Sequence, residues 1–174
     1  MLEELSDHLM DIAMNSVRAG ARNVAISVVA DKPRNLLSLA IVDDGKGMDD
    51  TMVKSVTDPF FSTKPGKNIG LGIPLLKGVA EMCEGEFMLE SSNGKGTEIR
   101  ASFALDHPDL PPLGKVKETF FLLCVSNPEV RFRFRYCPDQ EEFTFDTKEI
   151  NDSLEGVPIN HPEVVEFLKE YLNV

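Results

Sequence analysis

The sequence predicts an α+β fold: a two-layer sandwich with helices on one face of a mixed, mainly antiparallel sheet, followed by a small C-terminal α+β extension. Apolar residues recur at helical spacing in some segments and alternate with period two in others. The expected elements are helices at 2–19, 49–56 and 73–83 and strands at 23–29, 36–42, 86–90 and 97–105. This order, in which helices separate pairs of strands, favours helices packed against one face of a sheet.

The first expected helix, residues 2–19, carries a pair of polar side chains on one face. Asp11 and Asn15 are four residues apart, so their side chains project from the same side of the helix, one turn apart. A carboxylate and an amide in this arrangement can hold a water and a divalent cation together, and magnesium prefers such oxygen ligands. On this pair alone, an ordinary polar helix face is the simpler interpretation.

A turn rich in aspartate and glycine follows the strand at 36–42. This strand delivers Asp43 and a second carboxylate into a turn that contains Gly45 and Gly47. Glycine lets the backbone lie flat against a neighbouring group, and we expect that group to be a ligand. The alternative is a strand that simply ends in an Asp-Gly turn.

A second glycine-rich turn opens the helix at 73–83. The preceding residues, 58–72, are polar, contain glycine and proline, and are typical of a mobile loop over a site. Gly70, Leu71 and Gly72 then lead into the helix, where free N–H groups attract anions. With Lys64 and a second lysine nearby, this turn predicts a site for a polyphosphate.

Composition and charge exclude several classes of protein. The 174 residues carry a formal charge of −11, which would repel a nucleic-acid backbone, so we expect no nucleic-acid partner. No apolar run approaches a membrane span, and the acidic N-terminus does not resemble a signal segment, so we expect a cytoplasmic protein without membrane attachment. The three cysteines lack the spacing of a zinc site or of a disulfide framework.

Arginines cluster in one place. Arg131, Arg133 and Arg135 alternate with Phe132 and Phe134. At period two the arginines occupy one face of a strand and the aromatic rings the other. We interpret the segment as an amphipathic strand rather than as a stripe that binds nucleic acid.

Five motifs in the first 105 residues together resemble the GHKL ATPase superfamily, which includes gyrase, histidine kinases and the mismatch-repair ATPases. Residues 11–21, DIAMNSVRAGA, resemble the N box, and most of all its mismatch-repair form. Residues 43–48, DDGKGM, resemble the first glycine box. Residues 58–64, DPFFSTK, and 70–73, GLGI, are similar to the F box and second glycine box of histidine kinases, and 94–97, GKGT, to their closing glycine-threonine motif.

The resemblance implies a Bergerat-type fold that holds ATP in a bent pose under a lid. Asn15 would bind the magnesium ion that bridges the phosphates. Asp43 would accept a hydrogen bond from the adenine amino group, with Thr97 beside it. The residues implied to contact the nucleotide are Asn15, Asp43, Gly45, Gly47, Met48, Phe61, Lys64, Gly70, Leu71, Gly72 and Thr97.

Two departures from the family pattern concern catalysis. Hydrolytic members carry a glutamate four residues before the asparagine to activate water, whereas this chain has Asp11, which is shorter by a methylene. None of His8, His107 and His161 lies in the setting of a phospho-accepting histidine. We therefore expect a stand-alone protein kinase or regulatory ATPase in signalling that does not phosphorylate itself. The alternative is a nucleotide-gated interaction switch without catalysis, and a mismatch-repair role is a more distant one.

The C-terminal part is expected to form a small unit that packs on the ATP-binding part. We expect the ATP-binding domain to cover residues 1–105 and a proline-rich linker to cover 106–114. Residues 115–174 would form a small α+β extension, in which 116–125 is an apolar segment of ambiguous type. Because the superfamily core does not need this extension, we assign it to binding a protein partner or substrate, or to forming a homo-oligomer. The alternative is a simple structural extension of the fold.

Overall fold

The computed structural model of the chain describes residues 4–58 and 71–174. The helices are α1 (Leu5–Arg18), α2 (Asp50–Val56), α3 (Gly72–Met82), α4 (Val116–Ser126), α5 (Thr147–Ser153) and α6 (Pro162–Leu172), with a 3-10 turn, η1 (Lys32–Arg34). The strands are β1 (Asn23–Asp31), β2 (Leu36–Asp43), β3 (Phe87–Ser92), β4 (Gly96–Ala104), β5 (Arg131–Cys137) and β6 (Phe143–Asp146). Up to β4 these elements follow the predicted order.

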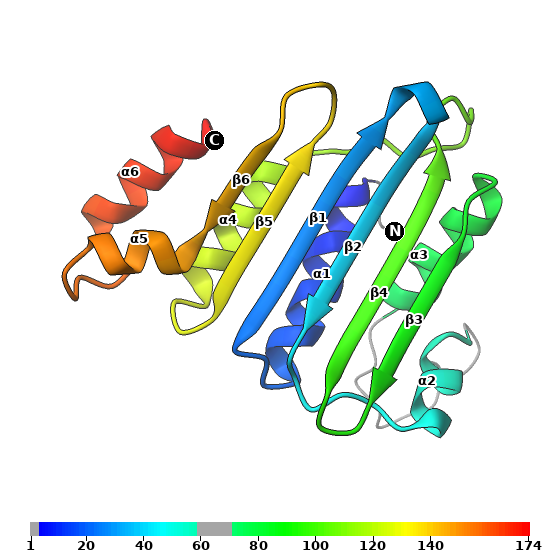
Figure 1. The fold of residues 1–174 in the computed structure, drawn as a ribbon, viewed down its shortest axis with the longest axis horizontal. Helices are drawn as coiled ribbons and strands as arrows, with labels where there is room; N and C mark the ends of the chain where they lie inside the picture. Colours follow the sequence, from blue (N-terminus) through cyan, green and yellow to red (C-terminus); the bar gives the residue numbers. More distant parts are fainter. Residues whose placement is uncertain (1–3, 59–70) are drawn as a thin grey trace.

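The described strands form a six-stranded sheet in the order β3-β4-β2-β1-β5-β6 (Figure 1). Neighbouring strands run antiparallel except β1 and β5, which run parallel. The predicted fold class, a mixed and mainly antiparallel sheet with helices, is therefore confirmed.

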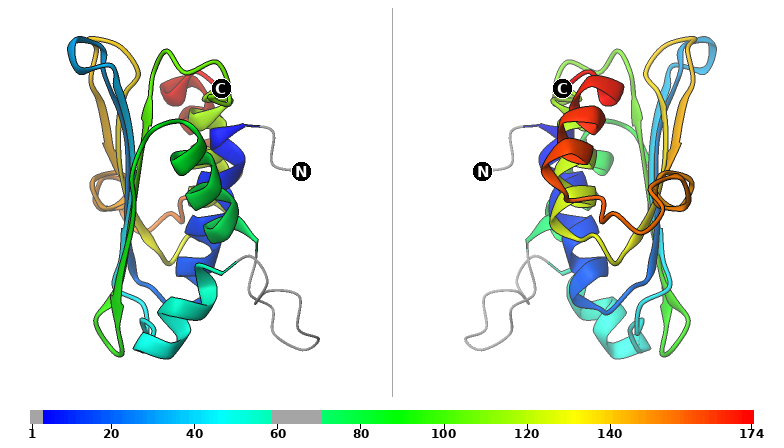
Figure 2. Two further views of the ribbon diagram at one scale, coloured as in Figure 1. Left: turned by 90° about the vertical axis from the view of Figure 1, so that its right-hand side faces the viewer. Right: turned by 90° about the vertical axis from the view of Figure 1, so that its left-hand side faces the viewer.

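The helices α1, α3 and α4 lie on one face of the sheet, and in the described part of the chain no helical layer covers the other face (Figure 2). Burial alternates along β1, where Val24, Ile26 and Val28 turn toward the helices. The apolar stripe of α1, with Leu9 and Ile12, packs over them. This alternation is what period two predicts for a sheet with one covered face.

Residues 115–174 continue the sheet of residues 1–105. Strand β5 pairs with β1 and places Phe132 opposite Val24. The ambiguous segment at 116–125 is helix α4, and its Phe120 is 1% exposed.

An aromatic cluster fills the space between α4 and the end of the sheet formed by β5 and β6. The Phe120 ring stacks on Phe134, with centroids 4.2 Å apart and planes inclined by 12°. It meets the edges of Phe132 and Phe145 at centroid distances of 6.4 and 5.2 Å. Such pairs contribute beyond the area that they bury.

The segment 106–114, expected to be a linker, packs against the start of α1. The N–H of Leu5 donates to the Pro112 carbonyl at 2.9 Å, and the N–H of Ser6 donates to the Leu113 carbonyl at 3.0 Å. The first N–H groups of a helix have no partner within the helix. The segment therefore supplies acceptors that α1 needs.

The arginine-rich segment is the amphipathic strand that its alternation predicts. In β5, Phe132 and Phe134 are buried under α4, whereas Arg133 and Arg135 are exposed on the open face of the sheet. Within the described ranges, no helix has the length and apolar character needed to cross a bilayer.

Candidate functional site

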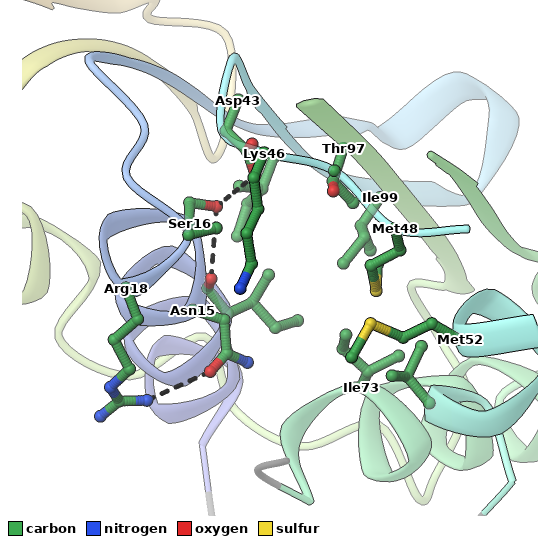
Figure 3. A pocket seen from close by; sticks show the side chains of 15 residues that line it. Asn15, Ser16, Arg18, Asp43, Lys46, Met48, Met52, Ile73, Thr97 and Ile99 are labelled. Carbon is green, nitrogen blue, oxygen red and sulfur yellow. Dashed lines mark hydrogen bonds between the residues drawn. The ribbon is translucent and has the colours of Figure 1, made fainter. Parts of the chain in front are cut away.

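A cavity of about 190 Å³ lies between α1, the sheet, α2 and the start of α3 (Figure 3). It is lined by Ile12, Asn15, Ser16, Arg18, Ala19, Ile41, Asp43, Lys46, Gly47, Met48, Met52, Val56, Ile73, Thr97 and Ile99. Most of these side chains are aliphatic or methionine, and a few polar groups converge at one end. This combination is typical of a site for a flat, largely apolar ligand with a few polar atoms.

Asp43 is the acidic residue that faces this cavity. Ser16 Oγ donates a hydrogen bond to Asp43 Oδ2 at 2.6 Å, and the N–H of Gly45 donates to Oδ1 at 2.8 Å. The two donors fix the plane of the carboxylate. Since each carboxylate oxygen has two lone pairs, both oxygens retain capacity for a donor on a ligand.

Asp44, next in the chain, has a structural role instead. Its Oδ1 accepts hydrogen bonds from the N–H groups of Arg22 and Asn23, each at 2.8 Å, and its Oδ2 accepts one from the Asn23 side chain at 2.7 Å. Burial alone would raise the pKa of Asp44, but the hydrogen bonds from Asn23 and Arg22 outweigh it and lower that pKa. Asp44 therefore ties the turn after β2 to the start of β1.

The register of the sheet aligns Asp43 with two hydroxyl groups. Asp43 lies opposite Thr97 on β4, and Thr97 lies opposite Ser91 on β3. The Ser91 and Thr97 hydroxyls are 2.9 Å apart, and Ser91 Oγ also accepts from the N–H of Met48 at 2.8 Å. Ser91 thus links the strand that carries Thr97 to the turn that carries Met48.

Gly45 and Gly47 are closely packed against neighbouring residues, and Gly47 also lines the cavity. Gly47 has a φ of +66°, and a Cβ added there would lie 2.0 Å from the carbonyl oxygen of Ser92. A Cβ on Gly45 would approach Ala19 Cβ and Asp43 Oδ1 at 3.0 Å each. The two glycines let the turn pack closely enough to bring Asp43 and Met48 to the cavity.

Polar and cationic groups surround the opening near α1. Arg18 Nη1 donates to Asn15 Oδ1 at 3.1 Å. The Lys46 side chain extends from its turn toward Asn15 (Figure 3). This end of the cavity therefore combines an amide with two cations, which suits the phosphates of a ligand.

Asp11, Leu71 and Gly72 line a hollow beside the cavity, and Arg18 lines both. A Cβ on Gly72 would lie 2.2 Å from Asp11 Oδ2, so the carboxylate lies directly against the start of α3.

The structure thus gathers Asn15, Asp43, Gly47, Met48 and Thr97 around one cavity, with Gly45 behind the Asp43 carboxylate. The predicted site residues Phe61, Lys64 and Gly70 lie outside the described residues.

Sequence reasoning missed Ser16 and Ser91 as site residues. Ser16 lines the cavity itself and binds Asp43, whereas Ser91 is linked to the cavity through Thr97. Ser16 directly follows Asn15 on the same helix, and this adjacency is the signal that would have placed it near the site.

The donor set fits a magnesium ion bound mainly by a nucleotide. In the part of the chain that the structure describes, no group of three or more His, Cys, Asp or Glu side chains could hold a metal ion. Asn15 offers a single amide oxygen at the opening of the cavity. Magnesium commonly takes one or two ligands from the protein and the others from phosphates and water, so Asn15 is suited to that role.

Sequence comparison relates residues 1–107 to known ATPases. They match the family model described as "Histidine kinase-, DNA gyrase B-, and HSP90-like ATPase". A putative sensor protein of Shewanella frigidimarina is 33% identical over 109 residues, which cover 62% of this chain and 17% of that protein. Sporulation kinase C of Bacillus subtilis is 29% identical over 102 residues, which cover 59% of this chain and 24% of that protein. The chain therefore corresponds to a small part of each relative.

Structural comparison extends the similarity to nearly the whole chain. The ATPase domain of Aquifex aeolicus MutL, solved in complex with ADP, superposes with a TM-score of 0.52 and 16% identity. The match covers 98% of this chain and 88% of that one. At this identity the likeness concerns the fold. The family match over residues 1–107 shows that the chain belongs to the histidine kinase-, DNA gyrase B- and HSP90-like ATPase family.

Proposed function

We propose that the chain binds ATP with magnesium in the cavity beside Asp43 and acts as a protein kinase or regulatory ATPase in cytoplasmic signalling. The observation that carries this proposal is the Asp43 carboxylate, held by Ser16 and Gly45 at the polar end of an otherwise apolar cavity. A carboxylate in this position selects a ligand that offers a hydrogen-bond donor from a flat apolar ring.

The adenine ring matches these requirements. Its exocyclic amino group donates to Asp43, and its faces pack between apolar side chains such as Ile41, Met48 and Ile99. Guanine carries a carbonyl oxygen where adenine carries this amino group. That oxygen would meet the carboxylate without a proton between them, which is unfavourable for a buried pair.

The phosphates extend toward α1 in this arrangement. Asn15 would hold the magnesium ion, and Arg18 and Lys46 add positive charge on the same side. Magnesium supplies charge neutralisation for the phosphate oxygens when it is bound. The start of α3, with Leu71 and Gly72, offers backbone N–H groups without a side-chain cap.

Asp11 is the residue that we assign to catalysis, as the general base for water or for an acceptor hydroxyl. It lies one turn before Asn15 on α1 and lines the hollow beside the cavity, which shares Arg18 with the end where the phosphates would lie. A general base must reach within hydrogen-bond distance of the proton that it removes.

A nucleotide-gated switch without catalysis is the second candidate, and the surroundings of Asp11 favour it. The carboxylate lies against the backbone of Gly72 and lines the neighbouring hollow rather than the cavity itself. In this proposal nucleotide binding alters the chain's affinity for another protein.

We further propose that residues 115–174 bind the protein partner or substrate, or a second copy of the chain. Exposed apolar side chains on α4 and α6 support this role: Leu122, Phe167 and Tyr171 are 50%, 49% and 50% exposed. The Phe167 and Tyr171 rings stack on each other at 5.9 Å. Large apolar side chains grouped at a surface are typical of interaction sites.

The test is calorimetry with magnesium and ATP on the wild type and on two matched variants. We expect Asp43→Asn to weaken ATP binding by about 10- to 100-fold, because a hydrogen bond to a charged acceptor is lost. Asp44→Asn removes a neighbouring carboxylate that only ties the turn, and we expect it to keep wild-type affinity. A wild type that binds neither ATP nor ADP would exclude the proposed function.

Phosphate release in the same samples separates the two candidates. Release that Asp11→Asn abolishes, with ATP binding retained, supports catalysis by Asp11. Binding without release, and without phosphate transfer to proteins of a cell extract, supports the switch.

A further inference from the structure

Ser91 is a half-buried serine on β3 that the proposed function does not use. Its Oγ lies 2.8 Å from the carbonyl oxygen of Gly96, 2.8 Å from the backbone nitrogen of Met48 and 2.9 Å from Thr97 Oγ1. A serine hydroxyl has one proton to donate and two lone pairs that accept. These three contacts therefore use the full hydrogen-bonding capacity of Ser91.

The chemistry of its partners fixes the direction of each bond. The Gly96 carbonyl can only accept and the Met48 N–H can only donate, so Ser91 gives its proton to Gly96 and accepts from Met48. The bond between the Ser91 and Thr97 hydroxyls can run either way on distance alone. If Ser91 gave its proton to Thr97, the Ser91 and Gly96 oxygens would lie 2.8 Å apart with no proton between them. Thr97 is therefore the donor to Ser91.

This direction determines what Thr97 offers to a ligand. Thr97 lines the cavity (Figure 3) and lies opposite Asp43 in the register of the sheet. Because its proton is used toward Ser91, its oxygen presents lone pairs to the cavity and no donor. The Asp43 carboxylate likewise only accepts. Two neighbouring groups at the polar end of the cavity thus offer acceptors alone.

Strand pairing keeps Ser91 within reach of Thr97. The two residues lie opposite each other on β3 and β4, and both are in phase with Ile99, which is buried under the helices. A hydroxyl proton turns about its C–O bond to suit the acceptors around it. Without the acceptor on Ser91, the Thr97 proton would be free to turn toward the cavity.

We propose that Ser91 is a positioning residue that keeps Thr97 from donating into the cavity, so that this end of the site selects a base that carries an amino group. The inference rests on the proposed function, since it assigns base selectivity at that site. A base without the amino group brings no donor to the two acceptors and receives none from them. When Ser91 is absent, the Thr97 proton can turn to Asp43 or to a ring nitrogen, and the amino group is then needed less.

The test compares two nucleotides that differ in one group. Purine riboside 5′-triphosphate has a hydrogen in place of the amino group of ATP and keeps the ring nitrogens and the phosphates. Calorimetry with magnesium gives both affinities, and their ratio measures selectivity for the amino group. We expect the wild type to prefer ATP by about 10- to 100-fold, because the other nucleotide leaves the Asp43 carboxylate without its donor, and Ser91→Ala to lower that ratio at least about fivefold.

Three further variants separate this role from a purely structural one. Ser91→Thr keeps a hydroxyl and should retain the wild-type ratio. Ser92→Ala changes the next, exposed serine of β3 and should also retain it. Thr97→Val removes the hydroxyl through which Ser91 acts. In that background we expect Ser91→Ala to leave the ratio unchanged.

Each outcome decides the inference. If Ser91→Ala weakens both nucleotides equally, or changes the ratio by the same factor with and without the Thr97 hydroxyl, Ser91 acts through the turn at Met48 and the inference is overturned. If Ser91→Ala does not fold, Ser91→Cys, which has a similar size and a weak acceptor, should lower the ratio in the same direction, and an unchanged ratio there overturns the inference as well.

The same measurements distinguish failure of this inference from failure of the proposed function. A wild type that binds neither nucleotide would overturn the proposed function and the inference with it. A wild type that prefers ATP, with a ratio that does not respond to the loss of the Ser91 hydroxyl, rejects the role of Ser91 alone.

Discussion

The two ends of the sheet are packed under the same helical layer in opposite ways. Between β5, β6 and α4, aromatic rings fill the interior, with Phe120 in contact with Phe134, Phe132 and Phe145. Between β2, β4 and α1, aliphatic and methionine side chains leave a cavity of about 190 Å³. Interiors are normally close-packed, so a cavity of this size with a fixed carboxylate at its end indicates a ligand site. We expect one end to contribute stability and the other to contribute binding.

Removing a ring from the aromatic cluster between β5, β6 and α4 has the largest expected effect on stability. Phe120→Ala should lower the free energy of unfolding by about 3–5 kcal/mol, because it leaves a cavity among three other rings. Urea denaturation measures this change. The control is Phe167→Ala, whose ring is 49% exposed and whose removal should cost about 0.5 kcal/mol or less. A folded Phe120→Ala protein that has lost ATP binding would contradict the separation of the two ends.

Filling the cavity between β2, β4 and α1 should affect ligand binding more than stability. Ile99→Phe enlarges a side chain that lines the cavity, and we expect ATP affinity to fall at least about tenfold, which corresponds to about 1.4 kcal/mol. The same change at Ile26, which is 3% exposed on β1, should instead destabilise the fold by about 1–3 kcal/mol through overpacking. Calorimetry and urea denaturation of both variants measure the contrast. Equal destabilisation by the two substitutions would show that the cavity is not available to a larger side chain.

A smaller effect is expected from the donor that holds Asp43. Ser16→Ala removes the hydrogen bond of 2.6 Å to Oδ2 and should weaken ATP binding about three- to tenfold, because the carboxylate loses its fixed orientation. Calorimetry measures the change, with Ser38→Ala on the open face of the sheet as the control. Unchanged affinity in Ser16→Ala would mean that Gly45 alone orients the carboxylate.

The smallest expected effect concerns an ion pair at the filled end. Arg131 donates two hydrogen bonds to Asp146, at 3.0 and 2.6 Å, and these lower the pKa of Asp146 against the opposing effect of burial. A carboxyl group whose pKa is lowered by folding adds stability above its unfolded pKa, which is about 4. That stability is lost as the pH falls through the folded pKa.

Asp146→Asn should therefore cost about 1 kcal/mol or less at pH 7 and less than that at pH 2, since the pair is partly exposed. Urea denaturation at the two pH values checks this difference. Asparagine can still accept the N–H of Lys148 at the start of α5, so the cap is retained. A cost that is the same at both pH values would assign the effect to packing or capping rather than to the ion pair.

Much of the fold follows from local patterns that the sequence carries on its own. The period of the apolar residues predicts a helix at 2–19 and a strand at 23–29, because burial of one face is a local requirement. The structure has these elements at Leu5–Arg18 and Asn23–Asp31. The spacing of Asp11 and Asn15 places both side chains on one face of α1. The turn signals at Gly45 and Gly72 mark where the strand ends and where α3 begins.

Other features depend on contacts between residues far apart in the chain. The two adjacent aspartates are chemically alike, and only the positions of Ser16 and Asn23 make Asp43 face the cavity and Asp44 tie the turn. The parallel pairing of β5 with β1 joins the C-terminal segment to the sheet. The residue pattern of neither strand predicts which strand it pairs with. Partner choice depends on the packing of the whole sheet.

The candidate site likewise depends partly on local sequence patterns and partly on contacts between distant residues. Its motif residues stand out in the chain because glycine, aspartate and asparagine have distinctive local chemistry. Their alignment with Ser91 comes from the register of β2, β4 and β3. A hydrogen bond forms only when two groups lie within about 3 Å of each other, and that distance is set by the folded chain rather than by either segment alone.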